Sequence, residues 1–303
     1  MPTAFPQVRV GEPICHDRIV VFPLFSDETK PVDYVLAADA IEAKQIVVEE
    51  ISEAGSVPNL SVTNDSDHRV LFLEGEQLVG AKQNRILNTS LLVAAKSKTT
   101  IPVSCVEQGR WGFKSKHFGS SDSYSPSKIR SALKASVSGS LSRGAGHTSD
   151  QGRIWQEVAT RHREHDVTSG TAAMEDIFEA RKGKLAELQK RFAYVPGATG
   201  VAIALGNKLV AVDMFDKPTT CHKVWERLLS GVLLDSLVAE QSTEQVEPKQ
   251  VEEFVSRIRN APWLPSPSVG EGEEVRAETD DGVYASALYL ADDLVHGSVA
   301  VAD

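Results

Sequence analysis

Short apolar segments separated by turn residues fill the first 110 residues, and they constrain the fold more than any other feature. These segments are rich in β-branched and aromatic residues, which is typical of strands; they are residues 18–25, 45–51, 60–63, 70–73, 91–94 and 99–106. Residues 91–94 and 99–106 are expected to pair antiparallel across the turn at residues 96–98. The pattern predicts an N-terminal antiparallel β-sandwich or partly open barrel.

The second half changes to helical periodicity and then returns to strands. Apolar residues recur at helical spacing in residues 150–165, 171–193, 219–239 and 248–259. A hairpin is expected over residues 200–215, because Gly206-Asn207 supplies a tight turn between two apolar runs. Further strands are expected after residue 270. The whole chain is therefore predicted to be α+β, with a mixed helix-and-sheet C-terminal part.

Composition divides the chain into three predicted segments. Residues 1–113 form a β-rich domain, and residues 151–303 form an α+β domain. Between them, residues 114–150 are rich in Ser and Gly, which favours a mobile loop interrupted by one short helix at residues 127–135.

The chain contains no apolar run near the roughly 20 residues that span a membrane, and its first residues lack the signal-peptide pattern. The three cysteines, Cys15, Cys105 and Cys221, are far apart and include no C-x-x-C pair. These features favour a reducing cytoplasm and no membrane partner. His162 and His165 share a helix face but have no evident third ligand, so neither a metal nor a cofactor is expected.

Polar residues concentrate in residues 70–111, in the motifs EGEQLVGAKQNRILN and IPVSCVEQGRW. Glu74 and Glu76 are the candidate catalytic residues, because two carboxylates on one face of an extended strand lie about 7 Å apart and one of them can act as acid or base. The candidate ligand-binding residues are Lys82, Gln83, Asn84, Arg85, Asn88, Glu107, Arg110 and Trp111. Their guanidinium and amide groups suit a phosphate and the edge of a base.

Each motif also has a structural explanation. One Glu can form a buried ion pair with Arg85 or Arg110, and the polar span 82–88 can be a network that joins strands. Cys105 shares a strand face with Ile101 and Val103, which favours an inert buried thiol. No Walker or G-x-G-x-x-G pattern is present, so a standard nucleotide loop is not expected.

Charge is distributed unevenly along the chain. Residues 81–130 hold nine Lys or Arg and two acids, a local charge of +7 in a chain of −10, which leaves −17 elsewhere. This asymmetry favours a small anionic ligand and disfavours a long nucleic acid without excluding it. A solvated basic face is the simpler alternative. A homo-oligomer is compatible with all of these features.

The two motifs, with residues 200–215 and the helix around Trp225, resemble the ARG and Rhodanese-Phosphatase-superfamily-associated protein domain, where ARG is ADP-ribosylglycohydrolase. The resemblance covers most of the chain. It implies genomic association with enzymes that process ADP-ribose and phosphate groups. It assigns no catalytic residue. Two functions are weighed: an enzyme acting on an ADP-ribose-like or other nucleotide substrate, and a non-catalytic sensor or protein-interaction module of a nucleotide- or NAD-linked stress or defence system. A purely structural role is the third alternative.

Overall fold

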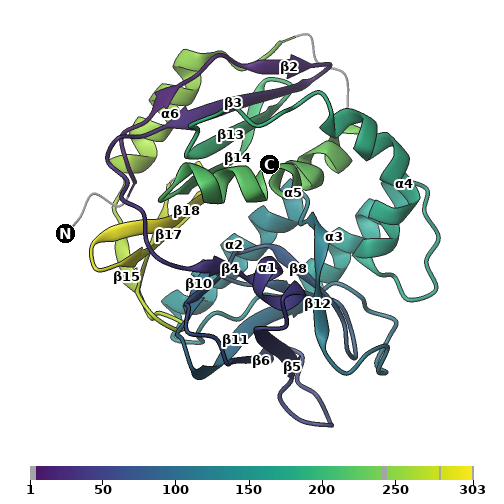
Figure 1. The fold of residues 1–303 in the computed structure, drawn as a ribbon. Helices are drawn as coiled ribbons and strands as arrows, with labels where there is room; N and C mark the ends of the chain where they lie inside the picture. Colours follow the sequence, from purple (N-terminus) through teal and green to yellow (C-terminus); the bar gives the residue numbers. More distant parts are fainter. Residues whose placement is uncertain (1–4, 240–243, 280, 302–303) are drawn as a thin grey trace.

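The computed structural model describes residues 5–239, 244–279 and 281–301, which form six helices and eighteen strands in three sheets (Figure 1). One sheet is a half-barrel, and the α+β class expected from the sequence is confirmed. None of the helices in these ranges is long and apolar enough to cross a membrane.

The largest sheet joins the two ends of the chain. Its strands run in the order β1 (Arg9–Val10), β3 (Ile19–Phe25), β13 (Gly200–Leu205), β14 (Lys208–Phe215), β18 (Asp293–Val301), β17 (Val283–Leu290), β16 (Glu273–Glu278) and β15 (Leu264–Ser266), with β2 (Ile14–His16) beside β3. The pairing of β3 with β13 brings residues about 180 positions apart into one ladder, with Val21 opposite Ile203. The predicted division of the chain into segments that end at residues 113 and 150 stays a prediction. The first of these segments, residues 1–113, supplies β1, β2 and β3 to this sheet.

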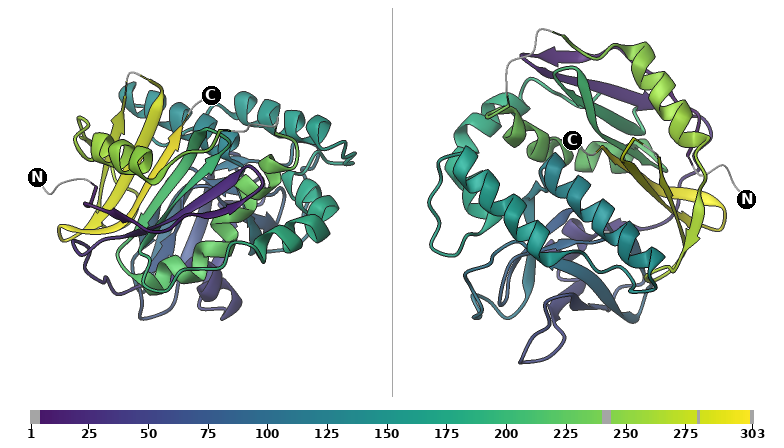
Figure 2. Two further views of the ribbon diagram at one scale, coloured as in Figure 1. Left: turned by 90° about the horizontal axis from the view of Figure 1, so that it is seen from above. Right: turned by 180° about the vertical axis from the view of Figure 1, so that it is seen from behind.

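Both faces of the large sheet are covered, because alternate residues of its strands point to opposite sides. Along β3, Ile19 and Val21 face one core, whereas Val20 and Phe22 face the other. Helix α6 (Pro248–Arg259) packs on the second face, and helices α2 (Ser127–Ser142), α3 (Gln151–Glu164), α4 (Met174–Gln189) and α5 (Pro218–Ser236) enclose the first core (Figure 2). The sheet is therefore the central layer of this half of the molecule.

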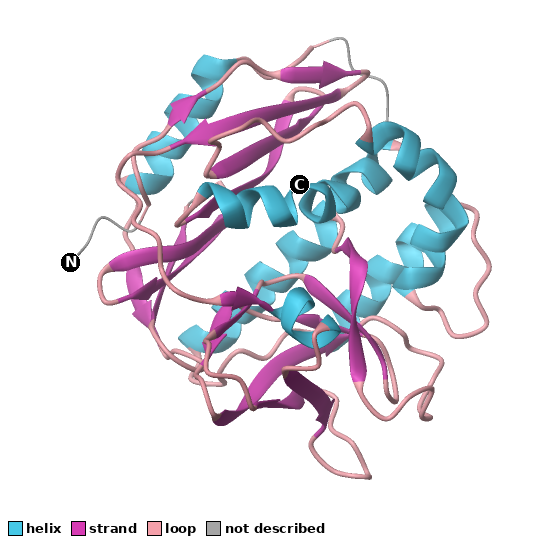
Figure 3. Ribbon diagram, viewed as in Figure 1, coloured by secondary structure: helices cyan, strands magenta, loops and turns pink. Residues whose placement is uncertain are grey.

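The remaining strands form a second β structure below the helices (Figure 3). A six-stranded sheet has the order β12 (Phe118–Tyr124), β8 (Glu76–Gly80), β9 (Arg85–Leu87), β11 (Ser97–Cys105), β6 (Asn59–Asn64) and β5 (Ile46–Glu50). Its two edge strands, β12 and β5, lie in contact, so the sheet curls. A three-stranded sheet of β10 (Leu91–Val93), β7 (Val70–Phe72) and β4 (Val35–Leu36) lies beside it, and α1 (Ala37–Glu42) follows β4.

The expected antiparallel pair of residues 91–94 and 99–106 is wrong. β10 pairs with β7, with Leu92 opposite Leu71, and β11 pairs with β6 and β9. Every residue of β10 is buried, so this strand needs covered faces on both sides, which a simple hairpin does not supply.

The Ser/Gly-rich segment differs from the loop that its composition favours. It forms strand β12, which pairs with β8, and a helix α2 that continues to Ser142 instead of ending near residue 135. The helix buries Ile129, Leu133 and Val137 in the first core. Tertiary packing thus overrides a weak local preference.

Candidate functional site

The motif of residues 70–111 is divided among three places in the fold, and Gly75 causes the first division. Its φ of +81° places a turn between β7 and β8, and β8 begins only at Glu76. Such a backbone conformation is accessible mainly to glycine. Because the backbone is not extended here, Glu74 and Glu76 do not share one face and meet different partners.

Glu74 lies in an enclosed ionic network beneath helix α2. The ammonium of Lys134 is 2.7 Å and 2.9 Å from its two carboxylate oxygens, and Lys134 also donates to Ser286 at 2.6 Å. Arg276 approaches the same carboxylate at 3.8 Å. All these side chains are buried, and burial lowers the pKa of Lys134 to about 8.

The network continues through further buried pairs on the large sheet. Arg276 donates to Glu274, which also pairs with His147 at 2.8 Å. Burial by itself raises the pKa of Glu274, but Arg276 and His147 outweigh it and lower that pKa to about 2. Arg130 binds both carboxylate oxygens of Asp213, at 2.9 Å and 2.7 Å. Cations and anions therefore balance across the contact between α2 and the sheet.

Ser90, His296 and Asp213 within this network stand in the order of a hydrolase triad, with Ser90 Oγ 2.8 Å from His296 and His296 3.3 Å from Asp213. Two contacts argue for a structural role. Asp213 is already held by Arg130, and the Ser90 hydroxyl accepts the backbone N–H of Glu74 at 2.9 Å. All three residues are buried, which denies a substrate access to the serine.

Glu76 lies behind a polar pocket between α1, β12 and α5. One of its carboxylate oxygens pairs with Arg227, and the other accepts the backbone N–H of Leu73 at 3.1 Å. Burial opposes the charge of Arg227, but Glu76 outweighs it and raises the pKa of the guanidinium. The pocket encloses about 450 Å³ and is lined by Arg227 and Lys223 together with the acids Asp39, Glu42 and Asp122. Its acids outnumber its cations, which disfavours an anionic ligand.

The third place gathers most of the predicted ligand-binding residues. Here the span 82–85 lies against the span 105–111. Arg110 donates to the carboxylate of Glu107 and to the side chain of Asn84 at 3.3 Å. Its remaining donors reach the backbone carbonyls of Gly80, Ala81 and Gly112. Since every N–H of Arg110 has a partner, this residue positions the loop and has no donor left for a phosphate.

Glu107 and Gln83 complete the support of this loop. Glu107 accepts from the backbone N–H of Asn84 at 3.0 Å, and Gln83 donates to the carbonyl of Glu107 at 2.9 Å. Burial favours the neutral carboxyl, but hydrogen bonds from Arg110 and Asn84 outweigh it and lower the pKa of Glu107. Glu107 is therefore an ionised acceptor and not a general acid.

Arg85 is fully buried directly beneath Trp111. Its Nη1 donates to Gln83 at 3.0 Å, and its Nη2 lies 3.9 Å from Glu50. Burial lowers the pKa of Arg85. Within the described part of the chain, its Nε and Nη2 and both carboxylate oxygens of Glu50 have no hydrogen-bond partner. The guanidinium carbon is 5.8 Å from the centre of the Trp111 ring, so the indole covers this polar pair.

The surface above Arg85 combines exposed aromatic rings with ammonium groups. Trp111 and Phe113 are 49% and 56% exposed, and the Lys82 ammonium lies 5.3 Å and 5.0 Å from their ring centres. Lys114 and Lys116 follow and are exposed. We call Lys82, Trp111, Phe113, Lys114 and Lys116 the Trp111 surface.

Two other residues of the motif lie inside the protein. Asn88 donates to the carbonyl of His147 at 2.8 Å and accepts from Ser104 at 2.6 Å, so it joins the ionic network and not the Trp111 surface. Burial raises the pKa of the Cys105 thiol, which contacts Gln83 at 3.1 Å. Cys105 is therefore a poor nucleophile, in agreement with its strand position.

The candidate histidine pair has structural surroundings. The ring nitrogens of His162 lie 3.1 Å from the carbonyls of Val167 and Ala173. Burial and the neighbouring Arg181 and Arg161 lower the pKa of His165 to about 4. Within the described ranges, no group of three or more His, Cys, Asp or Glu is arranged to hold a metal ion.

Sequence reasoning missed Phe113, Lys134 and Arg227. Phe113 could have been predicted as a surface residue of the site, because the run Trp-Gly-Phe-Lys-Ser-Lys at residues 111–116 places two aromatic residues beside two lysines. Lys134 and Arg227 carried no such signal, since they are distant in sequence from the carboxylates they neutralise.

Comparison with known proteins assigns this architecture to a family. The model of the ARG and Rhodanese-Phosphatase-superfamily-associated Protein domain matches residues 7–300, so the chain belongs to this family. The family name links it to ADP-ribosylglycohydrolases and to the rhodanese–phosphatase superfamily. Neither the search of curated proteins nor the search of solved structures returned a match.

Proposed function

We propose that this protein binds a phosphate-bearing, nucleotide-like ligand at the Trp111 surface. The observation that carries the proposal is the Lys82 ammonium placed between two half-exposed aromatic rings, at 5.3 Å from Trp111 and 5.0 Å from Phe113. A base stacked on an exposed ring gains about 1–3 kcal/mol. The exposed Lys114 and Lys116 supply charge-assisted contacts for phosphate oxygens, and the buried Lys82, which donates to the carbonyl of Ala54 at 3.0 Å, adds positive charge beneath the rings.

The loop that carries these rings is held in place before any ligand binds. The backbone N–H of Gly109 donates to Thr171 at 2.7 Å, and that of Lys114 donates to Ala81 at 2.9 Å. Arg110 adds its contacts from below. Because the loop is already ordered, binding costs little conformational entropy. This supports a ligand-binding role in preference to a solvated basic face.

The family name makes ADP-ribose the first ligand to test. The geometry supports binding without turnover, because Glu74 and Glu76 are engaged by Lys134 and Arg227 in other parts of the fold. In this proposal the protein is a sensor or binding module. ADP-ribose is expected to remain intact after long incubation, and its hydrolysis by pure protein would instead favour an enzyme.

Titration with ADP-ribose, ADP and NAD, followed by tryptophan fluorescence and melting temperature, tests the proposal. Wild-type protein is expected to bind at least one of them, more weakly at high salt. Trp111→Ala should weaken binding about 10-fold or more, which corresponds to the loss of one stacking contact. Trp111→Phe should retain part of the affinity because it keeps a ring.

Two exposed residues outside the Trp111 surface serve as matched controls. Leu264→Ala removes an exposed apolar side chain, and Lys182→Ala removes an exposed ammonium on α4. Both variants should bind as the wild type does. Equal affinity in wild type and Trp111→Ala, or no response to any of the three nucleotides, would show that the proposal is wrong.

A further inference from the structure

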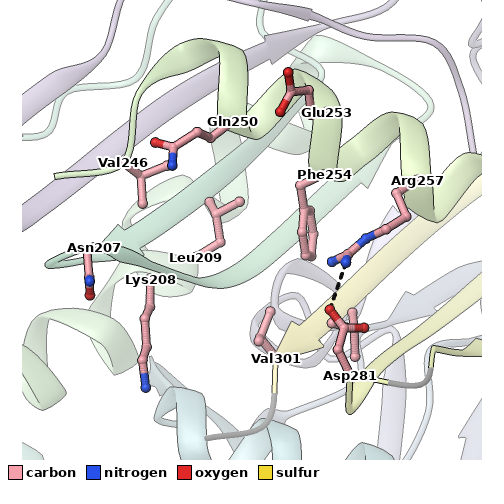
Figure 4. A pocket seen from close by; sticks show the side chains of 11 residues that line it. Asn207, Lys208, Leu209, Val246, Gln250, Glu253, Phe254, Arg257, Asp281 and Val301 are labelled. Atoms are coloured by element: carbon pink, nitrogen blue, oxygen red, sulfur yellow. Dashed lines mark hydrogen bonds and ion pairs between the residues drawn. The ribbon is translucent and has the colours of Figure 1, made fainter.

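A groove between helix α6 and one end of the large sheet contains none of the residues of the Trp111 surface (Figure 4). We call it the α6 groove. It encloses about 580 Å³, a volume typical of small-molecule sites. Its lining comes from α6 and the residue Val246 before it, from the β13–β14 turn and the start of β14, from the start of β17 with the preceding Asp281, and from the end of β18.

The groove follows from the amphipathic pattern of α6. Val251, Val255 and Ile258 bury one stripe of the helix against the sheet. Gln250, Phe254 and Arg257, spaced at four and three residues, occupy the neighbouring stripe and overlook the end of the sheet. Because antiparallel neighbours reverse direction, β14 begins, β18 ends and β17 begins at this same end.

Apolar side chains form the interior of the groove. Leu209, Phe254 and Val301 are only partly buried, and they pack beside the buried Val246 and Val283. Figure 4 shows Phe254 extending from α6 toward the sheet, with Leu209 near the middle of the groove. An apolar ligand body would complete the burial of these side chains and so remove further apolar area from water.

The charged residues of the lining differ in whether they are already paired. Arg257 and Asp281 form an ion pair at 2.7 Å, and Glu253 lies 3.8 Å from Lys249 on the same helix. Lys208, at the opposite end of the groove from Arg257, has no ion-pair partner among the described residues (Figure 4). The available charge is therefore one ammonium at the rim of an apolar groove.

We infer that the α6 groove binds a small amphipathic anion, namely a carboxylate with an alkyl or aryl body. The apolar body lies among Leu209, Phe254 and Val301, and the carboxylate pairs with Lys208. This combination of an apolar interior and a few polar groups at the rim is what defines a specific small-molecule site.

Three probes with one alkyl chain and different head groups test the inference: octanoate, octan-1-ol and octylammonium. Binding is measured by isothermal calorimetry and by the shift in melting temperature. Octanoate is expected to bind most tightly and octylammonium most weakly. Lys208→Glu should reverse the order of octanoate and octylammonium, because it reverses the charge at the rim, and Phe254→Ala should weaken all three probes.

The controls separate this site from the Trp111 surface. Lys182→Glu makes the same charge reversal on the exposed face of α4 and should leave the preference for octanoate unchanged. Trp111→Ala should also leave octanoate binding unchanged, so that either site can fail alone. Equal binding of the three probes, no binding of octanoate, or an unchanged order in Lys208→Glu would overturn the inference.

Discussion

At the scale of single residues, the charged side chains of residues 74–111 are satisfied mainly by one another and by the backbone. All N–H groups of Arg110 donate hydrogen bonds to Glu107, Asn84 and three backbone carbonyls. The carboxylate of Glu74 pairs with Lys134. Arg85 is buried against Glu50. Substitution of these residues should therefore change stability before it changes ligand binding, and the exposed Trp111 and Phe113 are the better reporters of function.

Lys134→Met is expected to lower the free energy of unfolding by about 3–5 kcal/mol, because it leaves the buried charge of Glu74 without its nearest partner. Urea denaturation measures the change. Lys190→Met, which breaks an exposed pair with Glu187 on α4, should cost about 0–1 kcal/mol. A loss below 1 kcal/mol in Lys134→Met would mean that Arg276 and Ser286 neutralise Glu74 without the lysine.

At the scale of elements, the turn at Gly75 decides which side of the molecule each carboxylate of the motif reaches. A Cβ atom at this position would lie 3.2 Å from the Tyr124 ring, in addition to the strain of a φ of +81°. The register between β8 and β12, which places Glu76 opposite Tyr124, depends on the same turn. The turn therefore links Glu74, which lies in the ionic network, to Glu76, which pairs with Arg227 behind the polar pocket between α1, β12 and α5.

Gly75→Ala is expected to destabilise the protein by about 1–3 kcal/mol, the usual cost of a non-glycine residue in a left-handed conformation. The shift in melting temperature measures this cost. Gly112→Ala is the matched control, because a Cβ there would meet no atom of the described residues within 4 Å. Equal melting temperatures for the two variants would contradict the assigned role of Gly75.

At the scale of the whole molecule, the ionic network joins the three segments of the chain. Glu74 comes from the turn between β7 and β8, Arg130 and Lys134 from α2, and Asp213 and Arg276 from the large sheet. Burial by itself raises the pKa of Asp213, but Arg130 outweighs it and lowers that pKa. The network therefore makes stability depend on pH.

Stability should fall in two stages on acidification. The folded-state pKa of His165 is lowered from 6.5 to about 4, so the unfolded chain binds its proton first and stability falls between these values, by roughly 3 kcal/mol at most. The pKa of Glu274 is lowered from 4.5 to about 2, so its contribution, present above 4.5, is lost below that pH. Melting temperatures measured from pH 7 to pH 2 give the profile.

His165→Gln should flatten the profile between pH 6.5 and pH 4 and leave the lower stage in place. His68→Gln, at an exposed histidine, should change neither stage. If His165→Gln keeps the upper stage, another group must be responsible for it.

The sequence by itself determined the α+β class and most helices and strands. These features follow from local periodicity and turn residues, which act over short distances along the chain. It did not determine the pairing of β3 with β13, the strand and helix formed by the Ser/Gly-rich segment, or the separate environments of Glu74 and Glu76. Those depend on contacts between residues far apart in sequence, because buried strands and charges are stabilised by whichever partners the packed fold brings to them.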